Sequence, residues 1–282
     1  MNSIQLDTYS LHSLLSPQPC QTKGAIGLGF PQVRLDQYNR PGIHGATVAH
    51  TLYGGRTITL DGTIRGADRT SFMANRAALE AAVSLKLDSV NVPIPRTLYL
   101  LDLDFSAYQV QVVTRSFQCE LTSPTMGKWQ LQLEAMDYIL ESQTTSTVNS
   151  FLPQSGGVVY AVTYPIHFGA SSGGSVTASN LGNAPAFPTV TLYGPMINPV
   201  IANDATGESV RLNLTLVAGD VVTINMRRRL IVQGSSTNRM GGLIQGSKFW
   251  AILPGNNSLR VSADAYDLGY ATFSWRDSRL GL

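Results

Sequence analysis

The residues that most often carry out chemistry are few in this chain. Four histidines are present, and His44 and His50 lie close together in a glycine-rich region. A zinc site needs Cys, His or carboxylate ligands at short, characteristic spacings, and these two histidines have no such neighbours. We therefore expect no metal site and no cofactor, and we interpret His44 and His50 as solvated or hydrogen-bonded loop residues.

Catalytic pairs are also hard to find. The serines have no recognisable base partner, so a Ser-His-Asp triad has no support. Glycoside hydrolysis needs two carboxyl groups that face one cleft. Nothing in the sequence pairs the available carboxylates, so we expect each on the solvent face of a strand, and we predict no catalytic residue and no enzyme activity. The carboxylates considered are Asp102, Asp104, Glu120 and Glu134.

Other segments match binding motifs only in part. Gly24–Gly29 has neither the glycine spacing nor the strand–loop–helix context of a nucleotide-binding loop. Asp204–Gly207 lacks the alternating acidic ligands of a calcium loop and is expected to be a tight turn. The basic run Arg227–Arg229 is expected to be a solvated hairpin tip in a chain of net charge +2. An aromatic platform for sugar is conceivable, but a place in the core is the favoured interpretation for Trp250, Tyr266, Tyr270 and Trp275.

Alternating side chains define the strands that would position any site. In Arg56–Arg65 apolar residues alternate with polar ones, which predicts a strand with one buried face. Lys128–Ala135 repeats this pattern. Asp68 is a good N-cap and precedes Arg69–Leu87, an alanine-rich segment whose apolar residues have helical spacing. We expect this segment to be the only helix and to pack across the first sheet.

The chain is expected to fold as two β domains. A Ser/Thr-rich stretch, residues 141–150, is interpreted as a linker between residues 1–140 and residues 151–282. Strand signals separated by turn residues favour an antiparallel sandwich or barrel in the second part. Further strands are expected in the first part at Leu98–Phe105, Tyr108–Val113 and Phe117–Leu121, and in the second at Tyr164–Phe168, Ser175–Ser179, Thr189–Tyr193, Ser209–Leu216, Val221–Met226, Leu230–Val232, Phe249–Leu253, Leu259–Ser262 and Ala271–Trp275.

Composition narrows the classes of partner and compartment. Charged residues are 13% of the 282 residues, against about 25% in typical domains, and the net charge is +2. Such a small net charge argues against a nucleic acid or an anionic membrane as partner. The sequence shows no secretory signal and no run of about 20 apolar residues. We therefore expect assembly in the cytoplasm, with Cys20 and Cys119 as free buried thiols.

The order and spacing of these signals resemble those of the siphovirus-type phage distal tail proteins, the Dit family. In the first half the resemblance rests on Gly55–Gly66, on the helix that begins at Asp68 and on Trp129–Asp137. All of these are turn and strand signals, so their order carries the resemblance. In the second half it rests on Asn180–Pro195, Asn198–Pro199, Gly219–Asp220, Phe249–Trp250 and Leu253–Asn257.

The resemblance implies a structural virion protein of the phage tail tip or baseplate. It implies an N-terminal β-sandwich belt domain with one α-helix, which forms a hexameric ring at the end of the tail tube, followed by a C-terminal galectin-like or carbohydrate-module-like β-sandwich. The implied partners are further copies of the chain, the tail tube protein, and a tail-tip hub, tail-associated lysin or fibre protein, with receptor-binding proteins in some phages. A surface poor in charge agrees with large subunit contacts, because interface cores are depleted of charge.

A different class of function stays open. The second domain could bind a host surface glycan directly, which would make the protein a carbohydrate-binding adhesin. A sixfold ring of the purified protein would favour the tail hub, whereas glycan binding without a ring would favour the adhesin.

Overall fold

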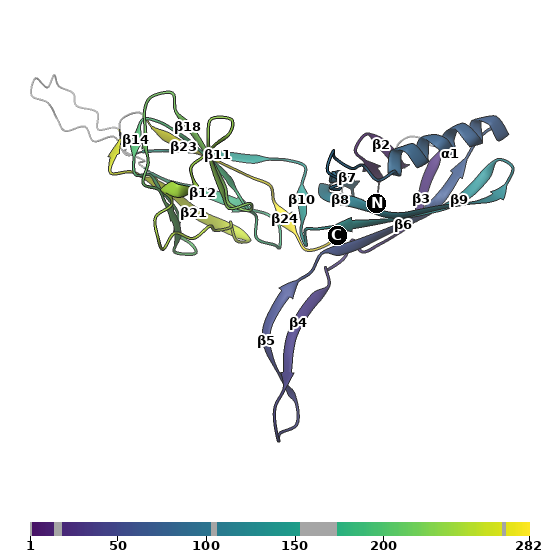
Figure 1. Ribbon diagram of the computed structural model, residues 1–282, viewed down its shortest axis with the longest axis horizontal. Coiled ribbons are helices and arrows are strands. Elements are labelled where there is room, and N and C mark those ends of the chain that lie inside the picture. The colour runs from purple at the N-terminus through teal and green to yellow at the C-terminus, as the bar shows by residue number, and fades with distance from the viewer. Residues whose placement is uncertain (1, 14–18, 103–105, 153–173, 267–268) are drawn as a thin grey trace, which may run out of the picture. The chain divides into compact units, whose positions relative to one another are not determined.

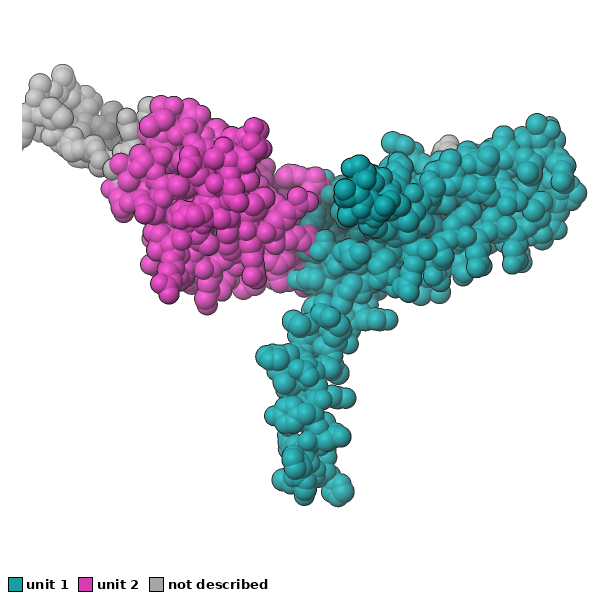
Figure 2. All heavy atoms as spheres, viewed as in Figure 1, with its two compact units in different colours: residues 1–143, 279–282 teal, residues 144–278 magenta. Residues whose placement is uncertain are grey.

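The computed structural model describes residues 2–13, 19–102, 106–152, 174–266 and 269–282 (Figure 1). These residues form a mainly β fold with one α-helix, which confirms the fold class expected from the sequence. The chain divides into two compact units: unit 1 contains residues 1–143 and 279–282, and unit 2 contains residues 144–278 (Figure 2). No helix in the described ranges is long and apolar enough to cross a membrane.

The boundary between the units, after residue 143, lies within the expected segment 141–150, but this segment is not a linker, and the expected second domain ends differently. Most of residues 141–150 lie in β10 (Leu140–Ser142) and β11 (Ser146–Phe151). Threonine, valine and phenylalanine favour strands, and β11 is an end strand of its sheet, so its polar composition reflects an edge position rather than a linker. Residues 279–282 belong to unit 1, where the Arg56 side chain binds the carbonyl of Leu280.

Unit 1 is built on a nine-stranded sheet. Its main path runs through β2 (Tyr9–Ser13), β1 (Ser3–Leu6), β7 (Arg96–Leu101), β8 (Ala107–Ser123), β9 (Met126–Ala135), β6 (Arg56–Arg65) and β3 (Cys20–Ile26), with β10 and β24 (Ser278–Arg279) beside this path. β6 and β9 pair along their whole lengths, and their alternate aliphatic side chains point into the core as predicted. The sheet curls, so its end strands approach each other, and Thr22 Oγ1 in β3 donates a 3.0 Å hydrogen bond to the carbonyl of Leu11 in β2.

β8 is one long strand where the sequence predicts two. The predicted strands Tyr108–Val113 and Phe117–Leu121 both belong to it, and a β-bulge at residues 114–116 separates them. A bulge adds one residue to a strand and shifts the alternation of its side chains, which makes one continuous strand resemble two. β7 is shorter than the predicted Leu98–Phe105, of which residues 103–105 lie outside the described residues.

The helix α1 (Arg69–Val83) begins where the sequence predicts. Asp68 Oδ1 accepts a 2.7 Å hydrogen bond from the backbone N–H of Ser71, and Ser71 Oγ accepts one of 3.0 Å from the N–H of Asp68. This reciprocal capping box satisfies N–H groups that the first turn leaves unpaired. The helix ends before the predicted Leu87, because the chain turns back on itself after Ser84. Its buried face packs against β6 and β8 through Phe72, Leu79 and Val83.

The described residues of unit 2 form three sheets, and the two larger ones share one hydrophobic core. The six-stranded sheet contains β11, β23 (Tyr270–Trp275), β13 (Thr189–Tyr193), β18 (Val221–Asn225), β19 (Leu230–Gln233) and β20 (Thr237–Asn238). The four-stranded sheet contains β12 (Ser175–Asn180), β21 (Gly255–Ser262), β15 (Val200–Asn203) and β16 (Glu208–Arg211). The three-stranded sheet contains β17 (Thr215–Leu216), β14 (Met196–Ile197) and β22 (Ala265–Tyr266), and one 3₁₀ turn, η1, spans Met240–Gly242.

Most strands predicted for unit 2 are present, with three differences. The predicted Ser209–Leu216 is divided between β16 and β17. The predicted Phe249–Leu253 is not a strand: Ile252 makes an isolated bridge to Ala186, and the alternating burial of this segment comes from packing into the core. The predicted Tyr164–Phe168 lies outside the described residues.

A buried arginine at the start of β6 ties several parts of unit 1 together. Arg56 is 2% exposed. Its guanidinium donates to the carbonyls of Gly29 at 3.1 Å and Leu280 at 2.7 Å, and also to those of Leu28 and Tyr138. Burial lowers the pKa of Arg56, yet the group stays charged because an arginine pKa begins far above neutral. A buried charge is costly unless it is compensated, so these carbonyls are needed for the fold.

The residue Arg56 gives a first prediction. We expect Arg56→Gln to lower the free energy of opening of β6 and β9 by roughly 3 kcal/mol, because it removes hydrogen bonds to a charged group and leaves buried carbonyls unpaired. Hydrogen exchange of the β6 and β9 amides measures this free energy. The control is Arg115→Gln, since Arg115 is an exposed partner of Glu134 at 3.2 Å and a surface pair contributes at most about 1 kcal/mol. Equal effects of the two substitutions would contradict the role assigned to Arg56.

An ion pair fixes the end of α1 to the sheet. Arg96 Nε lies 2.8 Å from Asp7 Oδ2, and the Arg96 guanidinium also donates to the carbonyl of Ala82 in the last turn of the helix. The N–H of Thr97 donates to Asp7 Oδ1 at 3.0 Å. Partial burial by itself raises the pKa of Asp7, but these hydrogen bonds and the charges of Arg96 and Lys86 together hold it below its ordinary value.

This ion pair predicts a loss of stability in acid. The pKa of Asp7 in the folded protein lies below its ordinary value of 3.8, so its contribution is complete above that value and is lost as the pH falls through the folded pKa. We expect the unfolding midpoints of wild type and Asp7→Asn to differ near neutral pH and to converge in acid. The control is Asp36→Asn, in an exposed hairpin, whose midpoint should follow that of wild type throughout. If the unfolding midpoints of wild type and Asp7→Asn differ by the same amount at every pH, ionisation of Asp7 does not cause the loss of stability in acid.

Candidate functional site

Among the described residues, the structure does not bring His12, His44 and His50 together with the cysteines as a reactive group, and His167 lies outside the described residues. His44 lies in the turn between two exposed strands, and His50 lies in the second of these strands. The described ranges contain no cluster of three or more His, Cys, Asp or Glu side chains that could hold a metal ion. Cys20 and Cys119 are free as expected, but only Cys20 is fully buried, because Cys119 lies near the exposed end of β8. Burial raises the pKa of both, that of Cys20 to about 12, so both thiols are protonated at neutral pH.

The carboxylates considered from the sequence lie in different places. Glu120 and Glu134 lie on the neighbouring strands β8 and β9. Glu134 Oε2 accepts a 3.0 Å hydrogen bond from Thr57 Oγ1 on β6, and this places it in a polar row on the outer face of the sheet. Asp102 lines a cavity at the end of β7. Asp104 lies outside the described residues. Residues 169–173, whose sequence matches the GxSxG pattern of a nucleophile elbow, also lie outside them.

Two of the candidate aromatic residues belong to the core of unit 2. Trp250 is 1% exposed and Trp275 is 6% exposed, and both indole N–H groups donate to backbone carbonyls. Tyr270 lies on β23, where its ring stacks on that of Tyr193 with the centroids 4.5 Å apart. The side chain of Tyr266 lies outside the described part of the chain. Trp250 and Trp275 are therefore core residues, whereas Tyr270 is not: it lies beside Tyr193 on the half-exposed face of the six-stranded sheet.

The remaining motifs are two turns and part of a strand. Asp204–Gly207 is a tight turn closed by backbone hydrogen bonds to the carbonyl of Asn203. Arg227–Arg229 forms the turn between β18 and β19, where Asn225 Oδ1 accepts a 2.8 Å hydrogen bond from a backbone N–H. Gly24–Gly29 runs from β3 into the loop that follows it and forms part of the wall of a cavity.

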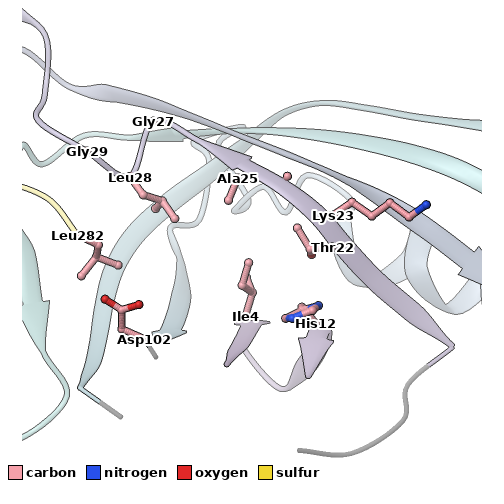
Figure 3. Close-up of a pocket in the computed structure, with 11 residues that line it drawn as sticks. Ile4, His12, Thr22, Lys23, Ala25, Gly27, Leu28, Gly29, Asp102 and Leu282 are labelled. Atoms are coloured by element: carbon pink, nitrogen blue, oxygen red, sulfur yellow. The ribbon is translucent and has the colours of Figure 1, made fainter. Parts of the chain in front are cut away.

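This cavity, of about 530 Å³, lies in unit 1 between β3 and the β1–β2 hairpin (Figure 3). Aliphatic side chains such as Ile4 and Leu28 line it together with His12 and Asp102. Burial lowers the pKa of His12, so its ring is neutral at pH 7. His12 Nδ1 has no hydrogen-bond partner among the described residues. The lining thus combines aliphatic groups with His12, Lys23 and Asp102, and these polar residues do not match a known catalytic or metal-binding arrangement.

The most unusual surface of unit 1 is a hairpin that stands clear of the sheet (Figure 1). β4 (Val33–Asn39) and β5 (Ala46–Tyr53) form a separate two-stranded sheet, and nearly all of their side chains are exposed. We call residues 33–53 the arm. A two-stranded hairpin without further packing is only marginally stable in water. The arm therefore has the properties of an element that packs against another molecule.

The two faces of the arm differ in charge. Cross-strand partners share a face, so the pairing of β4 with β5 sorts the side chains into two sets. One set contains no charged residue and is called the neutral face; the other contains the charged residues of both strands and is called the charged face. The neutral face consists of Val33, Leu35, Gln37, Asn39, Ala46, Val48, Thr51 and Tyr53, and the charged face of Arg34, Asp36, Tyr38, Thr47, His50 and Leu52.

The neutral face is the better candidate for an interaction surface. Its side chains Leu35 and Val48 are 54% and 50% exposed, which is unusual for aliphatic residues in a paired strand. Burial of apolar surface is favourable by about 25 cal/mol per Å². Covering the charged face would instead remove Arg34 and Asp36 from water, which is costly unless each charge finds a partner.

Contacts at its base and at its tip hold the arm in place, so each side chain stays on the face that the strand pairing gives it. At the base, the ring of Tyr53 stacks on that of Tyr138 with the centroids 5.4 Å apart. At the tip, Arg40 Nε donates a 2.8 Å hydrogen bond to Thr47 Oγ1. The arm thus presents a defined surface rather than a loose loop.

Sequence reasoning missed the arm, although two signals for it are present. Aliphatic and polar residues alternate through Val33–Gln37, as they do in a strand. The turn that follows, Arg40–Gly45, contains proline and two glycines with positive φ, Gly42 at 73° and Gly45 at 104°.

Comparison with known proteins places the chain near phage tail components. Residues 181–277 match a family model, SPP1_Dit, described as siphovirus-type tail component, C-terminal domain. The family resemblance found in the sequence is thereby confirmed. A comparison with curated protein sequences finds no match.

Two solved phage structures are similar to nearly the whole chain. The first is the crystal structure of SPP1 Dit (gp 19.1), described as a paradigm of hub adsorption apparatus in Gram-positive infecting phages; it is 12% identical, with a TM-score of 0.66 over 98% of each chain. The second is a chain of the phage P2 baseplate in its activated conformation with Ca; it is 10% identical, with a TM-score of 0.50 over 96% of this chain and 97% of that chain. At these identities the similarity shows a shared fold.

The placement of Trp250 predicts the result of removing it. We expect Trp250→Ala to lower the free energy of unfolding of unit 2 by about 3–5 kcal/mol, the usual cost of deleting a large buried aromatic side chain. Urea unfolding followed by circular dichroism measures the loss. The control is Tyr193→Ala on the half-exposed face of the sheet, which should cost clearly less. A Trp250→Ala protein as stable as wild type would rule out a core role.

Proposed function

We propose that this protein is a distal tail protein, a non-enzymatic structural component of the phage tail tip or baseplate. In this proposal six copies form a ring through unit 1. The ring joins the tail tube to a tail-tip hub, a tail-associated lysin or a fibre protein, and receptor-binding proteins are further partners in some phages. The protein is made and assembled in the host cytoplasm and resides in the virion.

The similarity of fold along nearly the whole chain carries this proposal. A TM-score of 0.66 over 98% of both chains relates this protein to SPP1 Dit, which is described as a hub. The family match at residues 181–277 adds support from sequence, since it concerns a tail component. Both lines of support concern a structural component, which favours a role in assembly over catalysis.

The arm supports assembly through unit 1. A closed ring needs a heterologous contact, in which two different patches on each copy meet. The neutral face of the arm is suited to be one of these patches, because it is free of charge, carries exposed aliphatic side chains such as Leu35 and Val48, and stands clear of the sheet. The low share of charged residues, 13%, agrees with large contacts between copies.

We assign the docking of other tail proteins to unit 2, as a galectin-like β-sandwich. Its two larger sheets share a hydrophobic core whose buried residues all belong to unit 2, the first being Leu152 and the last Trp275. A unit with its own core can present surface loops to partners without loss of its fold.

Electron microscopy and light scattering of the purified full-length protein test the ring. We expect sixfold rings for wild type. Leu35→Asp places a charge on the neutral face and is expected to reduce ring formation at least about tenfold, because burial of an unpaired charge costs more than 1.4 kcal/mol. Leu52→Asp is the matched control: it adds the same charge on the charged face, opposite Arg34, and should leave the rings intact. Leu35 and Leu52 are 54% and 58% exposed, so neither change should unfold the protein.

Two results would contradict this proposal. A wild-type protein that is monomeric at all concentrations would argue against a ring, and glycan binding by such a monomer would favour the adhesin instead. Equal loss of rings in Leu35→Asp and Leu52→Asp would show that assembly does not distinguish the two faces of the arm.

A further inference from the structure

Two short connections join the arm to the sheet of unit 1. Residues 27–32 lead from β3 into the arm, and only Gly54 and Gly55 lead from the arm into β6. Among the described residues, β4 and β5 pair with each other and not with the nine-stranded sheet (Figure 1). The N–H of Gly54 donates a 2.8 Å hydrogen bond to the carbonyl of Gln32 and closes the base of the arm. The angle between the arm and the sheet therefore depends on a few residues in each connection.

The end of each connection next to the sheet is fixed. Leu28 is buried in the core of unit 1, and the carbonyls of Leu28 and Gly29 both accept hydrogen bonds from Arg56. Gly55 is packed against the sheet, because a methyl group there would lie 2.9 Å from the carbonyl oxygen of Ala135. Fixed backbone consequently ends at Gly29 in one connection and at Gly55 in the other.

The glycines at the two places where the arm begins are not required by the conformation seen here. Gly27 is required, since its φ is 91° and a methyl group there would lie 2.1 Å from the carbonyl oxygen of Thr57. Gly29 and Gly54 have no positive φ. A methyl group at Gly29 would meet no atom within 4 Å, and one at Gly54 would lie at an ordinary 3.5 Å from the Gln32 carbonyl oxygen. Glycine offers both positions additional backbone conformations that this structure does not use.

We propose that the arm swings as one body about Gly29 and Gly54, and that the stack of Tyr53 on Tyr138 is the latch for the position seen here. Small residues at the ends of elements commonly absorb the backbone rotation of a hinge. The ring of Tyr53 is 44% exposed and lies 5.4 Å from that of Tyr138, so water can replace this contact when the arm moves.

Contacts beyond the hinge keep the arm in one piece while it swings. The backbone pairing of β4 with β5 extends from Val33 opposite Tyr53 to Asn39 opposite Ala46. The hydrogen bond between Arg40 and Thr47 lies at the far end. These contacts move with the arm, so a change of its angle does not break them.

A hinged arm changes how unit 1 meets another molecule. In an equilibrium between a latched and a released position, a molecule that binds one position better shifts the population toward it. The bound molecule then sets the angle of the arm. This inference goes beyond the proposed function and does not rest on the ring, because it concerns the arm within one copy.

Distances between two spin labels in the full-length protein test the hinge. Ile43→Cys places one label in the turn of the arm, and Ala74→Cys places the other on the exposed side of α1. Cys119→Ser removes the accessible native thiol, and Cys20 is fully buried. Labelled protein is diluted with unlabelled protein, so that each measured distance lies within one copy. We expect a latched and a released distance in the otherwise wild-type protein.

Substitutions at the hinge are expected to favour the latched distance. Gly29→Ala/Gly54→Ala should lower the released fraction at least about twofold, because alanine fits the latched position but loses the conformations that only glycine adopts. The matched control is Gly241→Ala in unit 2, where a methyl group also meets no atom within 4 Å and φ is not positive. This control should leave the distances unchanged.

Removal of the latch is expected to act in the opposite direction. Tyr138→Ala and Tyr53→Ala should each raise the ratio of released to latched molecules about two- to tenfold, the range expected for loss of one aromatic pair. Tyr38→Ala, at an exposed tyrosine within the arm, is the control and should not change this ratio. Labels at Ile43→Cys and Leu52→Cys, both within the arm, should keep one narrow distance in every variant.

Four results would overturn the hinge. They are a single narrow distance between the arm and α1 in wild type, equal effects of the hinge glycines and Gly241→Ala, an unchanged ratio in Tyr138→Ala, and a broadened distance within the arm, which would show that the arm melts instead of swinging. Each of these would leave the proposed function standing. A wild type that never forms rings would contradict the proposed function and leave the hinge standing.

Discussion

The buried guanidinium of Arg56 is the interaction on which unit 1 depends. Its charge is stable in the core only because backbone carbonyls surround it. Those carbonyls come from the loop after β3, from the segment before β10 and from residues 279–282. Segments far apart in the sequence must therefore meet at one side chain. The base of the arm lies among them, because Gly29 shortly precedes β4 and Tyr138 stacks on Tyr53. The arm is thus anchored to the same cluster of contacts that stabilises the core.

The parts of the fold that could be predicted from sequence are those with one buried and one solvated face. β6, β9 and β13 alternate cleanly because each packs one face on a core. The start of α1 was predictable from a single capping residue, Asp68. The bulge in β8 broke the alternation, and the polar edge strand β11 gave no strong apolar signal. Both cases show that a pattern of side chains reports burial rather than hydrogen-bonded pairing.

The candidate site could not be found by the same reasoning. A search for reactive groups depends on rare residue types at fixed spacings, whereas the side chains of the neutral face are ordinary aliphatic, amide, hydroxyl and aromatic groups. Nearly all of them are exposed, so no pattern of burial marks them. What distinguishes them is visible only with the register in hand: cross-strand pairing places Leu35 beside Thr51 and Leu52 beside Arg34, and so separates a neutral face from a charged one.

The return of residues 279–282 to unit 1 also sets an order of events during synthesis on the ribosome. The carbonyl of Leu280, which accepts a 2.7 Å hydrogen bond from Arg56, is made only after all of residues 144–278. While the chain is still growing, unit 1 contains an arginine whose compensation is incomplete, whereas unit 2 already has every residue of its own core. Domains generally fold as units while they emerge. The core residues of unit 2, up to Trp275, therefore all precede Leu280 in the chain, and the base of the arm gains the Leu280 contact only after they have been made.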